Sequence, residues 1–172
     1  MIFSRRRIVG TAALALPALL VARAARALDA PSGAVVLTVS GALRNPNQGP
    51  RAAFDMAMLE RLPQRTITTA TPWYSAPRSF TGPLLRDVLA AAGAASAGTV
   101  RMVALNDYRV DLPYEDAQRH DVIVARLLDG KPMAVRDKGP LFVMYPFDSQ
   151  PDLRNAVYFS RCVWQLKAID LL

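Results

Sequence analysis

The arrangement of short β-branched segments constrains the fold of this chain more than any other feature of its sequence. Seven segments have the β-branched or alternating character of strands, and only three stretches are typical of helices. The predicted strands are Ala34–Ser40, Arg65–Ala70, Val100–Leu105, Tyr108–Leu112, Val122–Leu128, Leu141–Tyr145 and Trp164–Ala168. Because these strands come in clusters with few helices to cross between them, we predict an α+β domain with a mixed or antiparallel sheet, rather than a doubly wound parallel one.

The predicted helices are short. They are Phe54–Leu62, a segment that opens at Pro83 and ends at Gly93, and Tyr114–Arg119. We expect irregular structure in the two proline-containing stretches, Thr71–Phe80 and Tyr145–Ala156. A chain of 172 residues corresponds to about one domain, so we expect a single domain over residues 28–172.

Residues 1–27 have the features of an export signal peptide. Three arginines at positions 5–7 precede an uncharged run of 15 residues, Ile8–Ala22, which is shorter than the stretch of about 20 residues that spans a membrane. Ala25-Arg26-Ala27 fits the small-x-small pattern of a cleavage site. The Ser-Arg-Arg start resembles a twin-arginine signal, with an ordinary Sec signal and an uncleaved anchor as alternatives. Each alternative places the domain outside the cytoplasm, so we expect a periplasmic protein.

The net charge of the chain comes mostly from this leader. The formal charge is +7, but five of the 21 basic residues and none of the 14 acidic residues lie before residue 28. The rest of the chain is therefore nearly balanced. Nucleic-acid binding needs a concentrated basic surface, so we expect no nucleic-acid partner.

The residues of common catalytic and metal-binding sites are scarce. The chain has one cysteine, Cys162, and one histidine, His120, which excludes an internal disulfide and a Cys/His zinc cluster. His120 lies between a predicted helix and a predicted strand, and we interpret it as a surface-loop residue. Cys162 is better explained as a packed structural cysteine than as a reactive thiol, because free cysteines are among the most buried residues.

Polar and aromatic residues gather in three loops beside predicted strands, Thr71–Ser75, Asn106–Arg109 and Val135–Pro140. For a planar heteroaromatic ligand, tryptophan or tyrosine offers a stacking face, asparagine or aspartate pairs with an amino-pyrimidine edge, and arginine or lysine donates to carbonyl or anionic groups. The candidate ligand-binding residues are Trp73, Tyr74, Asn106, Asp107, Tyr108, Arg136 and Lys138. On these grounds alone, ordinary solvated loops explain the pattern equally well.

An ordered series of segments covers roughly the last 90 residues. The segments are Phe80–Leu89 (FTGPLLRDVL), Asp111–Pro113, Asp121–Ala125, Asp129–Met133 (DGKPM) and Val163–Ile169 (VWQLKAI). Phe80–Leu89 resembles the aromatic-x-Gly-x-x-Leu-x-Asp-x-Leu segment of the molybdopterin-binding domain of the sulfite oxidase family. Asp111–Pro113 and Asp121–Ala125 together resemble the strand–helix–strand step of that domain. Asp129–Met133 resembles its Asn/Asp-Gly-x-Pro-Leu turn, and Val163–Ile169 resembles its closing strand. The resemblance implies the mixed α/β sulfite oxidase fold.

The cysteine that binds molybdenum in that family has no counterpart here. Its position falls near Thr69, and a hydroxyl does not replace a thiolate as a soft metal ligand. Cys162 lies near the final strand and does not match the position. The family's His-Gly pair is Lys138-Gly139 in this chain. Thr69 and Gly139 therefore join the candidate ligand-binding residues, and we expect no metal.

A narrower resemblance is carried by Leu105–Tyr108 (LNDY), Arg136–Leu141 (RDKGPL) and Tyr145–Asp148 (YPFD). These segments resemble small exported relatives of this fold, including the PruR-type periplasmic pterin-binding regulators. The resemblance implies a reduced pterin ligand without molybdenum, and a partner that is the periplasmic domain of a membrane-bound cyclic-di-GMP enzyme or sensor kinase. The expected function is thus a non-catalytic report of ligand occupancy. A molybdopterin-dependent oxidoreductase with an unusual ligand set is the alternative, and a fold relic that acts only as an interaction module is a third interpretation.

Two expectations follow for the geometry of this site. The bend at Gly139-Pro140 should hold Arg136 and Lys138 at the mouth of the pocket, facing the ligand rather than solvent. Tyr145–Ala156 is the best candidate for an element that changes on ligand binding, with Phe147 and Leu153 covering a neighbouring protein. A solvated basic loop and a plain connecting loop are the respective alternatives.

Overall fold

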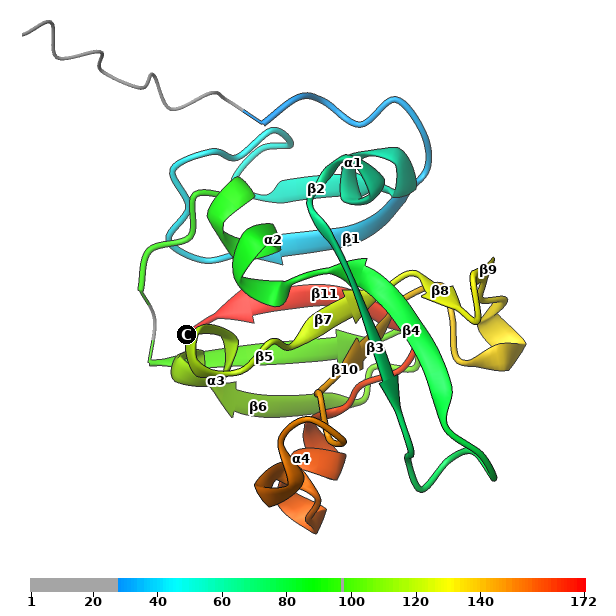
Figure 1. Ribbon diagram of the computed structural model, residues 1–172. Coiled ribbons are helices and arrows are strands. Elements are labelled where there is room, and N and C mark those ends of the chain that lie inside the picture. The colour runs from blue at the N-terminus through cyan, green and yellow to red at the C-terminus, as the bar shows by residue number, and fades with distance from the viewer. Residues whose placement is uncertain (1–27, 97) are drawn as a thin grey trace, which may run out of the picture.

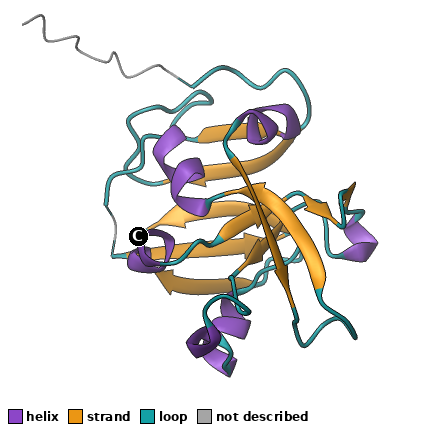
Figure 2. Ribbon diagram, in the orientation of Figure 1, coloured by secondary structure: helices purple, strands orange, loops and turns teal. Residues whose placement is uncertain are grey.

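The computed structural model describes residues 28–96 and 98–172, in which strands predominate and the helices are short (Figure 2). The strands are β1 (Val35–Ser40), β2 (Ala52–Asp55), β3 (Gln64–Thr69), β4 (Arg78–Pro83), β5 (Thr99–Ala104), β6 (Arg109–Pro113), β7 (Ile123–Ala125), β8 (Leu127–Leu128), β9 (Lys131–Pro132), β10 (Phe142–Met144) and β11 (Leu166–Leu171). The α-helices are α1 (Met56–Arg61), α2 (Leu85–Ala91), α3 (Tyr114–Arg119) and α4 (Ala156–Arg161). Two 3₁₀ turns cover Val135–Asp137 and Pro151–Leu153. The expected signal peptide, residues 1–27, lies outside the described residues. Within the described part, no helix has the length and apolar character needed to span a membrane.

The described strands form three sheets, with strand orders β2-β1-β11-β5-β6, β3-β4-β8-β9 and β10-β7. The pair β1–β11 is parallel and the other neighbouring strands are antiparallel. The mixed sheet of an α+β domain is therefore confirmed. The hairpin predicted around Asn106-Asp107 is confirmed as β5–β6, and its turn places Asp107 in the left-handed region at φ 63°.

The hairpin β3–β4 extends from the body of the molecule as a long arm (Figure 1). Its strands pair over six residues, from Gln64 opposite Pro83 to Thr69 opposite Arg78. The irregular structure predicted over Thr71–Phe80 is confirmed up to Pro77 and wrong for residues 78–80, which belong to β4; the helix predicted to open at Pro83 is confirmed but begins two residues later. Pro83 ends β4, and the helix begins at Leu85. The tip of the arm, residues 70–77, carries the first of the three candidate loops.

A strand and a helix replace the single helix predicted over Phe54–Leu62. β2 pairs with β1 up to Asp55, and the Asp55 side chain then caps α1 by accepting from the Met58 N–H at 2.8 Å. The same carboxylate accepts the N–H groups of Ser32 and Gly33 at 2.8 Å. These backbone donors, that of Met58 contributing most, lower the pKa of Asp55 from 3.8 to about 2.

The core beneath the candidate loops is rich in aromatic side chains. Phe80 from β4 and Phe142 from β10 meet edge to face at 5.8 Å between ring centres, and both are fully buried. The largest fully buried side chains include Phe54, Leu59, Leu85, Met102, Leu112, Ile123, Tyr145 and Phe147. Trp73, in the tip of the arm, packs on this core at 5.6 Å from Phe142. The core thus sets the position of one wall of the candidate site.

Candidate functional site

A pocket of about 590 Å³ opens where the tip of the β3–β4 arm meets the β5–β6 turn and the segment of residues 156–164. Its aromatic lining consists of Trp73, Tyr108, Phe159 and Trp164. Its polar lining consists of Asn106, Ser160 and Cys162. Two of the three loops predicted from the sequence, those around Trp73 and Asn106, therefore do meet at one cavity.

The rings around the pocket hold one another in place. Trp73 lies 6.2 Å from Phe159 and 5.9 Å from Trp164, in both cases close to edge to face. Such edge-to-face contacts fix the ring planes while leaving ring faces available to a further aromatic group. The arrangement is that of a site for a flat, mostly apolar ligand.

Asn106 and Asp107, adjacent in sequence, have different surroundings. The Asn106 Oδ1 atom accepts from the Tyr108 N–H at 3.1 Å, which leaves the amide nitrogen as a donor at the pocket. Asp107 pairs instead with Lys167 at 2.7 Å, and this contact lowers the pKa of its carboxyl group. Asp107 is therefore engaged away from the pocket lining.

The loop Val135–Pro140 contributes less to the pocket than the sequence predicted. The expectation that Arg136 faces the pocket is wrong, because its side chain is 88% exposed and its only ion pair among the described residues is a 3.5 Å contact with Asp137. The 3₁₀ turn that contains Arg136 projects this side chain outward. Lys138 is half-buried, with Nζ 5.2 Å from the ring centre of Tyr74 and 5.9 Å from that of Trp164. Lys138 thus lies over an aromatic ring of the wall and is not itself part of the lining.

Tyr74 and Gly139 act as supports around this wall. Tyr74 packs on Phe80 at 6.1 Å and carries Arg78 at 5.2 Å, on a ring that does not line the pocket. Gly139 is buried, and a Cβ atom there would lie 2.0 Å from the carbonyl oxygen of Met133. The close approach of these two segments requires glycine at this position.

The donor atoms present do not match a molybdenum site. Thr69 is fully buried, and its hydroxyl donates to the Ala70 carbonyl at 3.4 Å. Burial raises the pKa of Cys162 to about 12, so its thiol at the pocket wall is neutral. The part of the chain that the structure describes contains no cluster of three His, Cys, Asp or Glu side chains placed to hold a metal ion. A neutral thiol and a hydroxyl do not supply the soft thiolate that molybdenum takes as a ligand.

One polar atom beside the pocket has no protein partner. The Thr71 Oγ1 atom is buried without a hydrogen bond, one residue before Pro72, which lines the pocket. An unpartnered buried hydroxyl is costly, so it calls for a partner from outside the protein, either water or a ligand.

The segment that follows Tyr145 is irregular up to α4, as predicted, but its apolar side chains do not lie where the sequence indicated. Phe147 and Leu153 are buried, so neither covers a neighbouring protein, as the sequence had suggested. His120 is half-buried rather than a surface-loop residue, with its ring 5.7 Å from Tyr158 and its Nδ1 atom 2.7 Å from the Gln150 Oε1 atom. Cys162 is buried as predicted, and it directly follows α4 and lines the pocket.

Helix α4, which supplies Ala156, Phe159 and Ser160 to the lining, was not predicted from the sequence. Asn155 is the residue that could have indicated the start of this helix. Its side chain accepts from the N–H groups of Val157 and Tyr158, which makes it a typical helix N-cap. A helix of six residues is too short to leave a periodic apolar pattern.

Comparison with protein families identifies this architecture. The model of the oxidoreductase molybdopterin binding domain matches residues 32–147. The chain belongs to this family. The match includes Trp73, Asn106 and Tyr108 of the lining, but it ends before α4 and Trp164. The matched range contains five of the eleven lining residues, and the segment of residues 156–164 supplies the other six.

A search of curated protein sequences finds no significant match to this chain. Among solved structures, the sulfane dehydrogenase SoxCD from Paracoccus pantotrophus is similar, with a TM-score of 0.58 at 16% sequence identity. The similarity covers 78% of this chain and 37% of that chain. The present chain thus spans little more than a third of the length of SoxCD, and the likeness concerns the fold.

Proposed function

We propose that the pocket binds a metal-free reduced pterin. The observation that carries this proposal is the lining, which combines the rings of Trp73, Phe159 and Trp164 with the amide of Asn106. A pterin is a flat bicyclic ring with an amino-pyrimidine edge. Its faces stack on aromatic side chains, and its edge exchanges hydrogen bonds with an amide or a hydroxyl. The unpartnered Thr71 hydroxyl beside the lining supports a ligand with such an edge.

The donor atoms support a ligand without molybdenum. The position of the family's metal-binding cysteine falls near Thr69, whose hydroxyl is already bonded within the protein. The thiol of Cys162, in the pocket lining, has its pKa raised by burial to about 12. Neither atom is a thiolate at neutral pH, so the chain lacks the ligand type that would fix molybdenum at this pocket.

A molybdopterin-dependent oxidoreductase is the second candidate, and membership of the molybdopterin-binding family favours it. Molybdopterin contains the same pterin ring, so the aromatic lining suits both ligands. When bound, molybdopterin would supply redox chemistry at its metal, and the residues of this chain that would hold its ring are Trp73, Asn106 and Trp164. Metal content separates the two candidates.

We propose further that the protein is exported to the periplasm and reports pterin occupancy to the periplasmic domain of a membrane-bound cyclic-di-GMP enzyme or sensor kinase. Exposed apolar side chains in the segments that line the pocket support a surface contact of this kind. They are Tyr108 and Trp164, which line the pocket, and Leu105 and Val157, each next in sequence to a lining residue. Exposed apolar groups that gather on one surface mark interaction sites, and the two lining rings would change their surroundings when the pocket fills.

Three measurements test this function. Purified protein should contain far less than one molybdenum atom per chain, and the ligand it carries should have the absorbance and fluorescence of a pterin. A candidate partner domain should bind the pterin-loaded protein more tightly than the empty one. Equal affinity in both states would remove the reporting role, and conversion of the pterin to a product would replace it with catalysis.

A further inference from the structure

Helix α4 forms one wall of the pocket but buries none of its own residues. Ala156, Phe159 and Ser160 line the cavity, and Cys162 follows at the end of the helix. A helix of six residues has almost no stability of its own. Contacts between its side chains and the rest of the molecule must therefore keep this wall in place.

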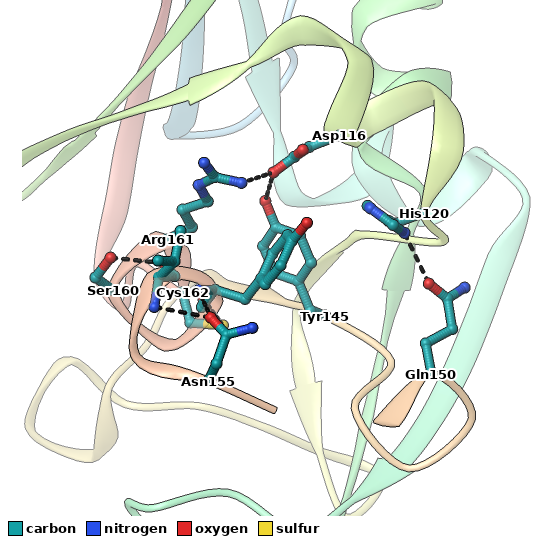
Figure 3. A network of polar contacts seen from close by, with 10 residues as sticks. Asp116, His120, Tyr145, Gln150, Asn155, Ser160, Arg161 and Cys162 are labelled. Carbon is teal, nitrogen blue, oxygen red and sulfur yellow. Dashed lines mark hydrogen bonds and ion pairs between the residues drawn. The ribbon is translucent and has the colours of Figure 1, made fainter. Parts of the chain in front are cut away.

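A buried carboxylate outside the pocket holds the end of α4 (Figure 3). Asp116, on α3, is only 6% exposed. Its Oδ2 atom accepts from Arg161, the last residue of α4, at 2.7 Å and from the Tyr145 hydroxyl at 2.7 Å. Burial, and then this carboxylate, raise the pKa of Tyr145, so the hydroxyl keeps its proton and remains a donor.

The remaining contacts of α4 are made by aromatic rings. Tyr158 lies 5.5 Å from Tyr145 and 5.0 Å from the Arg161 guanidinium carbon, and Phe159 lies 4.8 Å from Phe147. Each ring contact adds only modestly to the area that it buries, whereas loss of one partner of a largely buried ion pair leaves an uncompensated charge and is costly. The pair Asp116–Arg161 is therefore the contact that anchors the C-terminal end of α4 to α3.

We propose that Asp116 and Arg161 are positioning residues that set how long a ligand stays in the pocket. The ion pair holds α4 against the cavity, and Phe159 on α4 covers a ligand that lies against Trp73. A bound ligand and the ion pair thus stabilise the same position of α4, so the two are coupled, and each strengthens the other. Neither residue touches the ligand. This inference rests on the proposed pterin binding and names the element that controls release.

The test uses purified protein without the expected signal peptide, residues 1–27, and the synthetic probe 6,7-dimethyltetrahydropterin. Fluorescence of the pocket tryptophans, recorded by stopped flow under anaerobic conditions, reports association and release separately. The substitution Asp116→Asn keeps the size of the side chain but removes the charge that Arg161 needs. We expect release to become about tenfold faster with little change in association.

Asp121→Asn is the matched control. Asp121 lies two residues after α3, with a half-exposed side chain, and it pairs with Arg86 rather than with α4. Its substitution should leave both rate constants unchanged.

Variants of Arg161 test the other partner of the ion pair. Arg161→Met should release the probe faster than the wild type, and Arg161→Lys should restore part of the slow release. The double variant Asp116→Asn/Arg161→Met should release the probe no faster than either single variant.

The results separate failure of this inference from failure of the proposed function. Release at the wild-type rate from folded Asp116→Asn and Arg161→Met proteins would overturn the positioning role. If wild-type protein binds no pterin, the proposed function fails, and hydrogen exchange then decides the role of the ion pair. Amides of α4 should exchange faster in Asp116→Asn than in Asp121→Asn, and equal exchange would overturn it. If Asp116→Asn does not fold, the Arg161 variants give the same comparison.

Discussion

The ammonium nitrogen of Lys138 lies 5.9 Å from the ring centre of Trp164, at the rim of the pocket. Lys138 adopts the left-handed conformation, with φ 72°, directly after the turn that turns Arg136 outward. Two neighbouring cations that look equivalent in the sequence therefore have different environments. One lies over the aromatic wall, and the other extends into solvent.

Substitution of these two cations should have unequal effects on pterin affinity. Lys138→Ala removes the cation that holds the ring of Trp164 at the pocket, so pterin affinity should fall by at most the worth of that cation–π contact, about 0.5–1 kcal/mol or two- to fivefold. Arg136→Ala should leave the affinity unchanged. Calorimetric titration with the same reduced pterin measures both, and equal losses would contradict this assignment.

Asn106 should contribute one hydrogen bond to the ligand. Asn106→Ala removes the amide donor and should weaken binding by about 1 kcal/mol. Asn106→Ser keeps a side-chain acceptor for the Tyr108 N–H but shortens the side chain and removes the amide, so it separates the support of the turn from the contact with the ligand. Affinity lost in both variants supports a direct contact, whereas affinity restored in Asn106→Ser would show that only the turn matters. Asp107→Asn, at an exposed ion pair, is the control that should bind normally.

Cys162 should react slowly with thiol reagents in the native protein. Because burial raises its pKa to about 12, almost no thiolate is present at pH 8, where an ordinary cysteine is partly ionised. Alkylation by iodoacetamide should be at least about a hundredfold slower than in the protein unfolded in urea. Rapid alkylation of the folded chain at pH 8 would contradict the neutral thiol and reopen Cys162 as a metal ligand.

Asp55 should make stability depend on pH in the acid range. Its pKa is about 2 in the folded protein against an ordinary 3.8, so it stabilises the fold above the ordinary value and loses that contribution as pH falls toward 2. The urea midpoint of the wild type should therefore drop between about pH 4 and pH 2. Asp55→Asn should be less stable at pH 7 and should drop less over this interval. Asp152→Asn, on an exposed turn, should follow the wild type, and a parallel drop in all three proteins would exclude Asp55 as the cause.

The strands that alternate or carry β-branched residues could be predicted from the sequence, and those whose partners decide their conformation could not. β1, β5 and β6 were found within one residue at each end. β4 was missed because Pro77, Gly82 and Pro83 disfavour a strand locally, while pairing with β3 along six residues overrides that preference. The single strand predicted over Val122–Leu128 divides at Arg126, because β7 pairs with β10 whereas β8 pairs with β4.

The site was predictable only where loop residues carry their own signal. Trp73, Asn106 and Tyr108 were identified as candidates from their types and their positions beside strands, and all three line the pocket. The contribution of α4 was not predictable, because Phe159 and Ser160 reach the pocket through the tertiary contacts that hold a helix of six residues. For Arg136, the sequence indicates a basic loop but not the 3₁₀ turn that directs its side chain outward.

The central claim is that this pocket binds a reduced pterin without molybdenum, and one titration tests it most directly. The purified protein, with metal removed and metal content verified, is titrated calorimetrically with 6,7-dimethyltetrahydropterin under anaerobic conditions. The account predicts saturable binding of one pterin per chain, accompanied by quenching of tryptophan fluorescence from the pocket wall. Absence of binding by the metal-free protein, together with one equivalent of molybdenum in the protein as isolated, would contradict it.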